Sequence, residues 1–273
     1  AAAFCETYDG FIFNHNEAKL YQWIEEYDPP LFQKIQDLVQ KGKWHIMGGW
    51  YLQPDCVMSS GESIFRQMEK GLNYFREKFG CRPRTAINVD SFGHDRGLVQ
   101  LLLKSGYTSY LVGRPSLEVC KAPGPDFLWE GYDGTCIPVH LAAEGYNSGL
   151  GKVRRKLEYY RRQEGTDNSV LALWGIGNHG GGPSKEDLDE ISLLQKEWEK
   201  EGVQLIHSTP EMYFDSISGS ELPLFDREIG PSMPGCYTSQ VRIKQTHCLL
   251  ENMLYQTEKL LAAAEIFTGM EGD

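Results

Sequence analysis

The chain has 273 residues (31.0 kDa), of which 41% are hydrophobic and 24% are charged. That composition is typical of one large soluble globular domain, or of one domain and the start of another. No apolar run approaches the roughly 20 residues of a membrane span, so we expect no membrane partner. The net charge of -11 argues against nucleic-acid binding, which needs a basic surface, and leaves neutral partners such as sugars open.

The seven cysteines indicate a reducing compartment. They are odd in number and scattered, and none belongs to a Cys-x-x-Cys pair. This pattern argues against a disulfide framework or a zinc knuckle. The first residues also lack the basic stretch and apolar core of a signal peptide, so we predict a cytoplasmic protein. The sequence leaves open whether the chain forms a homo-oligomer.

Strand and helix signals alternate along residues 1–220. Short apolar runs bounded by turn residues predict strands, and apolar residues at intervals of three and four predict helices between them. The predicted strands are 44–47, 85–89, 109–112, 127–130, 135–141, 170–174 and 203–207. The predicted helices are 17–39 (interrupted by Pro29-Pro30), 63–79, 98–104, 153–163, 184–201 and a short one from Thr209.

This alternation implies a parallel sheet with right-handed crossovers, either an open doubly wound sheet or a barrel. We therefore assign residues 1–220 to one α/β domain. Parallel sheets place their functional residues at the carboxyl ends of the strands. The residues that follow each predicted strand are consequently the first candidates for a site.

Residues 221–273 have a different character. The stretch 221–236 is irregular and rich in proline and glycine, whereas 239–267 follows one long helical pattern. A helix of that length at the end of the chain has little here to pack against. We therefore interpret 221–273 as a linker followed by the first helix of a helical bundle.

An acidic residue follows the predicted strand 85–89. Asp90 comes directly after it and precedes Phe92, Gly93 and His94. A carboxylate in this position serves as a nucleophile or as a metal ligand. An aspartate after a strand is also a common helix N-cap, so both interpretations stay open.

Two glycine-rich segments follow other predicted strands. In 48–55, Trp50 and Asp55 suit a sugar, because C–H groups stack on rings and hydroxyls bind carboxylates; a turn with a buried tryptophan is the alternative. The loop 175–183 carries Asn178 and His179. It lacks the spaced glycines and the lysine of a phosphate-binding loop, which argues against a nucleotide site.

Several motifs together resemble one enzyme family. In order, spacing and register they look like the N-terminal domain of glycoside hydrolase family 38, the α-mannosidases, and in part like its bacterial branch. The resemblance covers nearly the whole chain and implies a partial catalytic domain, a parallel (β/α) barrel of about seven strands that is incomplete at the N-terminus. The motifs are NHNE (14–17), WHIMGGWYLQPD (44–55), SGES (60–63), RTAINVDSFGH (84–94), GNHGGGP (177–183), GCYTS (235–239) and KQ (244–245).

The resemblance implies a retaining mechanism in which Asp90 is both the nucleophile and a zinc ligand. The family has an arginine 24 residues after the nucleophile, where this chain has Arg114, which would hold Asp90 ionised and oriented. Zinc would bind the 2- and 3-hydroxyls of mannose. Trp50 and Phe92 would line the sugar subsite, and Tyr146 would add a hydroxyl. The expected partner is a mannose-containing oligosaccharide.

Two features of the family have no match in this chain. Its His-x-Asp zinc pair is absent from the sequence, so we expect the zinc ligands other than Asp90 outside this chain. Its acid/base carboxylate is replaced by Asn178-His179. His179 is then the candidate acid/base and Asn178 a substrate contact, while Glu144 and Asp55 are alternative acids.

Two other functions stay open. A metal-dependent polysaccharide deacetylase has a similar barrel, but it needs two histidines and an aspartate around one metal, and the sequence contains no His-x-x-x-His pair. The second alternative is an inactive fragment that only binds carbohydrate. Metal content and activity on an aryl α-mannoside distinguish the three.

Overall fold

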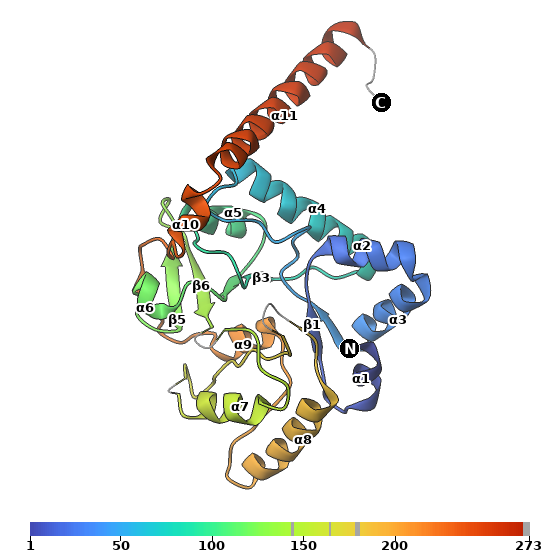
Figure 1. Ribbon diagram of the computed structural model, residues 1–273, viewed down its shortest axis with the longest axis vertical. Helices are drawn as coiled ribbons and strands as arrows, with labels where there is room; N and C mark the ends of the chain where they lie inside the picture. The colour runs from blue at the N-terminus through green and yellow to red at the C-terminus, as the bar shows by residue number, and fades with distance from the viewer. Residues whose placement is uncertain (143–144, 164, 178–180, 270–273) are drawn as a thin grey trace.

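The computed structural model describes residues 1–142, 145–163, 165–177 and 181–269. Glu144, Asn178 and His179 lie outside these residues. The described strands form a parallel pair, β1-β2, and a five-stranded sheet in the order β3-β4-β6-β5-β7 (Figure 1). The strands are β1 (Phe13–His15), β2 (Trp44–Ile46), β3 (Thr85–Asn88), β4 (Ser109–Val112), β5 (Asp126–Glu130), β6 (Cys136–Leu141) and β7 (Leu224–Phe225).

The predicted barrel of about seven strands is not found in the part of the chain that the structure describes. Its strands stay in two sheets, and no ladder joins β2 to β3 there. β5 runs antiparallel to β6, because the turn between them is too short for a helical crossover. The described residues 170–174 and 203–207, both predicted as strands, form no named strand. The architecture is a mixed α/β fold in which parallel pairs predominate.

The helices begin and end at residues that break or cap them. Asp28 separates α2 from α3, and its Oδ1 accepts a hydrogen bond from the backbone N–H of Leu31 at 3.2 Å. Ser60 caps α4 in the same way, and Gly80, at φ 65°, ends it. The helices are α1 (Ala2–Thr7), α2 (Ala18–Tyr27), α3 (Pro29–Gln40), α4 (Gly61–Phe79), α5 (Gly97–Lys104), α6 (Leu117–Cys120), α7 (Val153–Arg161), α8 (Lys185–Glu199), α9 (Pro210–Ser216), α10 (Pro234–Thr238) and α11 (Val241–Thr268).

Helices cover both faces of the five-stranded sheet, with α4 and α5 on one side of β3 and α9 on the other (Figure 1). Successive strand residues point to opposite faces. Tyr110 therefore packs with Met68 and Leu102, whereas Leu111 packs with Tyr213. Because both faces are covered, every residue of β3 and β4 is buried.

The predicted linker begins inside the α/β region. Leu224 and Phe225 form β7, which pairs in parallel with β5, and Ile229 is buried in the same core. Part of the predicted linker therefore packs with the α/β region, and the domain boundary at residue 220 stays a prediction. Irregular chain then leads to α10 and to α11.

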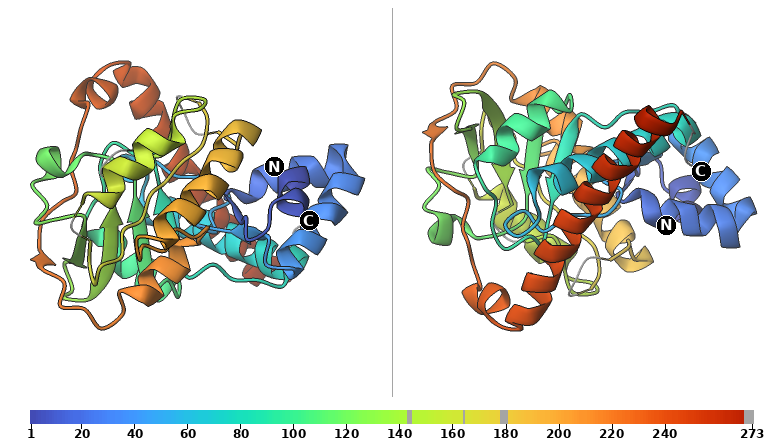
Figure 2. Two further views of the ribbon diagram at one scale, coloured as in Figure 1. Left: turned by 90° about the horizontal axis from the view of Figure 1, so that it is seen from below. Right: turned by 90° about the horizontal axis from the view of Figure 1, so that it is seen from above.

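The helix α11 projects from the rest of the chain (Figure 1) and crosses α4 when seen from above (Figure 2). Its contact with α4 is polar. Glu251 accepts hydrogen bonds from the backbone of Ser60 at 3.1 Å and from the hydroxyl of Ser63 at 2.5 Å. Arg66 donates two hydrogen bonds to Glu258, at 2.5 and 2.6 Å. The large apolar side chains of the helix are exposed: Val241, Ile243, Leu249, Leu250, Met253, Leu254, Leu260, Leu261, Ile266 and Phe267.

Candidate active site

The register of β3 and β4 brings Asp90 and Arg114 together. The two strands are parallel, with Asn88 opposite Val112. Each chain runs two residues further, so Asp90 and Arg114 lie at equal distances beyond the end of the ladder. Arg114 Nε lies 2.6 Å from Asp90 Oδ1. The interval of 24 residues between Asp90 and Arg114 therefore follows from the parallel register of β3 and β4.

A glycine permits this close approach. The backbone N–H of Gly113 donates to the carbonyl of Asn88 at 2.9 Å. A Cβ at position 113 would lie only 2.2 Å from the carbonyl oxygen of Val89. Any side chain there would force the two strand ends apart. The pair formed by Asp90 and Arg114 thus depends on the absence of a side chain between them.

The ion pair between Asp90 and Arg114 is partly exposed to solvent at the carboxyl ends of β3 and β4. The side chains of Asp90 and Arg114 are 34% and 36% exposed, so solvent screens their attraction. Asp90 Oδ1 is buried and has no aligned hydrogen bond within the described residues. The exposed area of the carboxylate side chain therefore belongs to its other atoms. The guanidinium of Arg114 also lies over the ring of Phe92, 5.8 Å from its centroid, which adds a cation–π contact.

A buried histidine holds the main chain of Arg114. His94 is 2% exposed, with Nε2 at 2.8 Å from the carbonyl oxygen of Arg114 and Nδ1 at 2.7 Å from the hydroxyl of Tyr110. A carbonyl only accepts, so Nε2 carries the proton and donates, and Nδ1 accepts from Tyr110. Burial lowers the pKa of His94 to about 4. The ring is therefore neutral near pH 7 and serves as a support for Arg114.

Buried histidines predict a loss of stability in acid. Burial lowers the pKa of His15, His94 and His207 from 6.5 to about 4. Between these values the unfolded chain binds protons that the folded chain excludes, so the free energy of unfolding falls as the pH drops from 6.5 to 4. Each histidine contributes a slope of at most about 1.4 kcal/mol per pH unit. Urea unfolding across this range measures the slope.

The matched variants for that experiment are His94→Gln and His247→Gln. The first removes a buried ring, and the second removes a side chain on α11 that is 40% exposed. We expect the first to reduce the slope and the second to leave it unchanged. Equal slopes in the parent protein and in His94→Gln would refute the assignment.

Of the two sugar contacts predicted in 48–55, the structure places Trp50 in the core, and the role of Asp55 stays a prediction. Trp50 is fully buried, packs near Tyr107, and donates from its indole N–H to the carbonyl of Ile87 at 2.7 Å. Its ring has no exposed face for a sugar, so the core alternative holds. Asp55 is exposed, and its Oδ1 accepts hydrogen bonds from two backbone N–H groups of its own turn, at 2.9 and 2.7 Å. Its Oδ2 accepts from Tyr237 at 3.3 Å.

The remaining predicted residues are only partly placed. Phe92 lies beside Arg114, as described above. Tyr146 is half-buried, and no hydrogen bond within the described residues joins it to Asp90 or Arg114. Asn178 and His179, like Glu144, fall outside the described residues, so their roles stay predictions.

Sequence reasoning missed two contributors to the site. Gln53 Oε1 accepts a hydrogen bond from the backbone N–H of Val89, next to Asp90, at 3.0 Å. From the predicted linker, Ile229 exchanges two backbone hydrogen bonds with His94, at 2.9 and 3.2 Å. The position of Gln53 after β2 was a usable signal. The contact of the linker had no local signal, because it joins segments more than a hundred residues apart.

The described residues do not form a zinc site by themselves. No group of three or more His, Cys, Asp or Glu side chains within them could hold a metal ion. The sequestered Oδ1 of Asp90 faces an arginine, and one carboxylate alone does not hold zinc.

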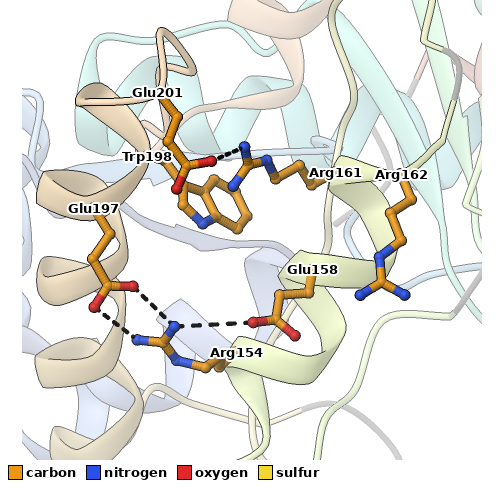
Figure 3. Close-up of a pocket in the computed structure, with 7 residues that line it drawn as sticks. All are labelled: Arg154, Glu158, Arg161, Arg162, Glu197, Trp198 and Glu201. Atoms are coloured by element: carbon orange, nitrogen blue, oxygen red, sulfur yellow. Dashed lines mark hydrogen bonds and ion pairs between the residues drawn. The ribbon is translucent and has the colours of Figure 1, made fainter.

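A surface groove of about 340 Å³ lies between α7 and α8 (Figure 3). Most of its charged side chains form ion pairs with each other. Arg154 contacts Glu197 at 2.9 Å, and Arg161 contacts Glu201 at 2.5 Å while lying over the ring of Trp198. These ion pairs therefore join α7 to α8, and the groove shares no residue with the Asp90 site.

Comparison with known proteins agrees with this geometry. Residues 1–232 match the model of the family described as "Glycosyl hydrolases family 38 N-terminal domain". The chain is 29% identical to "Alpha-mannosidase G" of Dictyostelium discoideum over 97% of its length, and 28% identical to human "Alpha-mannosidase 2C1" over 93%. It spans 25% of each of these proteins. Its fold resembles the crystal structure of an α-mannosidase from Enterococcus faecalis V583, with a TM-score of 0.71, 21% identity, and coverage of 84% of this chain and 27% of that one.

The fold and the match define a glycoside hydrolase domain. The chain belongs to glycosyl hydrolase family 38, through its N-terminal domain. No helix of the described residues has both the length and the apolar character needed to cross a membrane.

Proposed function

We propose that the intact protein is a retaining α-mannosidase that removes terminal α-linked mannose from oligosaccharides by double displacement. The observation that carries the proposal is the pair of Asp90 and Arg114, 2.6 Å apart at the carboxyl ends of two parallel strands. Membership of family 38 and relatives with the name α-mannosidase support the substrate class.

In the proposed reaction Asp90 attacks the anomeric carbon and forms a covalent glycosyl-enzyme, which water then hydrolyses. Arg114 contacts Oδ1 and holds the carboxylate in position. The ring of Phe92 packs against the guanidinium of Arg114, and the buried His94 donates a hydrogen bond to the main-chain carbonyl of Arg114. The leaving oxygen needs a proton, for which His179 is the candidate donor and Glu144 and Asp55 are alternatives.

The proposed enzyme uses a bound metal. We predict that the intact protein binds zinc, with Asp90 as one ligand and the other ligands outside this chain. Metal analysis of the purified intact protein tests this. Less than one equivalent of zinc after dialysis against metal-free buffer would contradict the prediction.

All seven cysteines are free, which supports a reducing, cytoplasmic compartment.

The test of function is hydrolysis of 4-nitrophenyl α-mannoside, followed by proton NMR of the released sugar. We expect α-mannose as the first product, because double displacement retains configuration. The β-mannoside is the matched control and should not react. Release of β-mannose first would refute retention. Acetate release from an acetylated polysaccharide would favour the deacetylase, and sugar affinity without turnover would favour a binding protein.

Arg114→Met tests the role of the ion pair. Methionine keeps the length of the stem but removes the cation, so Asp90 loses the group that orients it. We expect kcat/KM to fall about 5-fold, because the pair is about one-third exposed and a screened pair of this kind contributes about 1 kcal/mol. An unchanged kcat/KM would contradict the assigned role. Arg84→Met, at an exposed ion pair with Asp215, is the control.

A further inference from the structure

Two side chains take the place of a backbone ladder between β2 and β3. The indole N–H of Trp50 donates to the carbonyl of Ile87 at 2.7 Å, and the amide oxygen of Gln53 accepts from the N–H of Val89 at 3.0 Å. Residues two apart in a strand direct their backbone groups to the same side. Ile87 and Val89 therefore both face β2, where the described residues form no ladder.

The hydrogen bond from Val89 to Gln53 lies directly before the nucleophile in the chain. On the opposite side of β3, the carbonyl of Asn88 accepts from the N–H of Gly113 at 2.9 Å. The main chain that leads into Asp90 is thus held by the backbone of Gly113 on one side and by the side-chain amide of Gln53 on the other. The side chain of Asn88 adds hydrogen bonds to the carbonyl of Pro54 at 3.3 Å and to the hydroxyl of Ser91 at 3.1 Å.

Gln53 is in turn held by Glu17. Glu17 Oε1 accepts from the backbone N–H of Gln53 at 3.3 Å, and burial raises the pKa of this carboxyl. Glu17 has φ 67° and ψ 105°, a strained conformation for a residue with a side chain, and it makes no capping hydrogen bond to α2. Capping of the helix by the side chain therefore does not explain this conformation. The hydrogen bond to Gln53 gives the carboxylate a role.

The loop that carries Gln53 has other anchors. The backbone N–H of Leu52 donates to the side chain of Gln67 at 3.0 Å, and that of Tyr51 donates to the carbonyl of Gln67 at 2.9 Å. The N–H of Ala18 also donates to the carbonyl of Trp50 at 2.9 Å. Removing the amide of Gln53 should therefore leave the loop in place and act locally on Val89.

We propose that Gln53 is a positioning residue for Asp90, and that Glu17 fixes Gln53 for this role. The proposal rests on the proposed function, because it takes Asp90 as the nucleophile. Loss of the amide frees the residue before Asp90 to shift, and a misplacement of about 1 Å costs about 100-fold in rate. In this role Gln53 acts on Asp90 and not on the substrate, so binding should change much less than turnover.

The test compares Gln53→Leu, Gln53→Glu and Gln67→Leu in the intact protein. Leucine has a similar size and no acceptor, so kcat should fall about 10- to 100-fold with KM within about threefold. Glutamate keeps an acceptor for the N–H of Val89, so this variant should retain kcat within about threefold. Gln67→Leu removes an equivalent bond from the same loop, and kcat should stay within about threefold.

Glu17 is tested by two variants. Glu17→Gln keeps an acceptor for the N–H of Gln53 and should retain most of kcat, whereas Glu17→Ala should lose about 5- to 10-fold, as expected for one hydrogen bond. An unchanged kcat in Gln53→Leu would overturn the proposal, and so would an equal loss in Gln67→Leu, which would indicate general loosening of the loop. If Gln53→Leu does not fold, Gln53→Glu decides, because a loss of kcat beyond about threefold in a variant that keeps the acceptor would overturn the proposal.

A covalent label separates this proposal from the assignment of the nucleophile. A fluorinated mannosyl fluoride should trap the glycosyl-enzyme of the parent protein, and peptide mass spectrometry should find it on Asp90. A label on another residue would refute the nucleophile. A label on Asp90 with normal kcat in Gln53→Leu would refute the positioning role alone.

Discussion

Replacing Asp90 with alanine is expected to abolish hydrolysis of an aryl α-mannoside, with kcat at least about 10,000-fold below that of the parent protein. Without the carboxylate no covalent intermediate can form, and Arg114 Nε loses the oxygen that lies 2.6 Å away. Substrate binding should change far less, because the nucleophile acts mainly in the transition state. Steady-state kinetics with the intact protein measure both effects.

Asp95→Ala is the matched control. It removes a second aspartate of the same loop, whose carboxylate is exposed and accepts from the backbone N–H of Gly97 at 2.7 Å. Its kcat should stay within about threefold, since its loss removes one surface hydrogen bond. Turnover in Asp90→Ala within tenfold of the parent protein, with an unchanged unfolding temperature, would remove Asp90 from the mechanism.

The second large effect is expected from Gly113→Ala. The new Cβ would lie 2.2 Å from the carbonyl oxygen of Val89, and a backbone atom cannot move aside as a flexible side chain can. The ends of β3 and β4 must then separate. We expect about 3 kcal/mol of lost stability, at the upper end for overpacking, and a loss of turnover as Asp90 parts from Arg114.

Urea unfolding and kinetics on the same samples measure these two losses. Gly124→Ala is the control, because a Cβ at that position meets nothing within 4 Å. It should change stability by less than about 0.5 kcal/mol, as is usual for open surface positions. Wild-type stability in Gly113→Ala would show that the strand ends accommodate a methyl group, and that their close approach is not required.

Residues in regular elements were the most predictable part of this chain. The strand before Asp90 and the strand before Arg114 are short apolar runs, and parallel pairing alone brings their ends together. The proline break between α2 and α3 was equally clear, because proline fits the first turn of a helix and Asp28 caps it.

The failures have a common physical origin in long-range contacts. The run 170–174 is apolar like a strand, but a strand also needs a neighbour for its backbone, which the sequence does not specify. The sequence could not decide whether Trp50 contacts a sugar or lies in the core, because a tryptophan beside glycines is compatible with both; the structure buries it. Gln53 was overlooked because an amide that replaces a ladder bond has no motif of its own.

The parallel register of β3 and β4 also limits which insertions the domain tolerates. Asp90 and Arg114 each lie two residues beyond paired positions, Asn88 and Val112. One extra residue inside either strand would turn the following side chains to the opposite face of the sheet and uncouple the pair. Lengthening the crossover through α5 would leave both strand ends where they are. Natural variation in chain length should therefore gather in that connection and be absent from the strands.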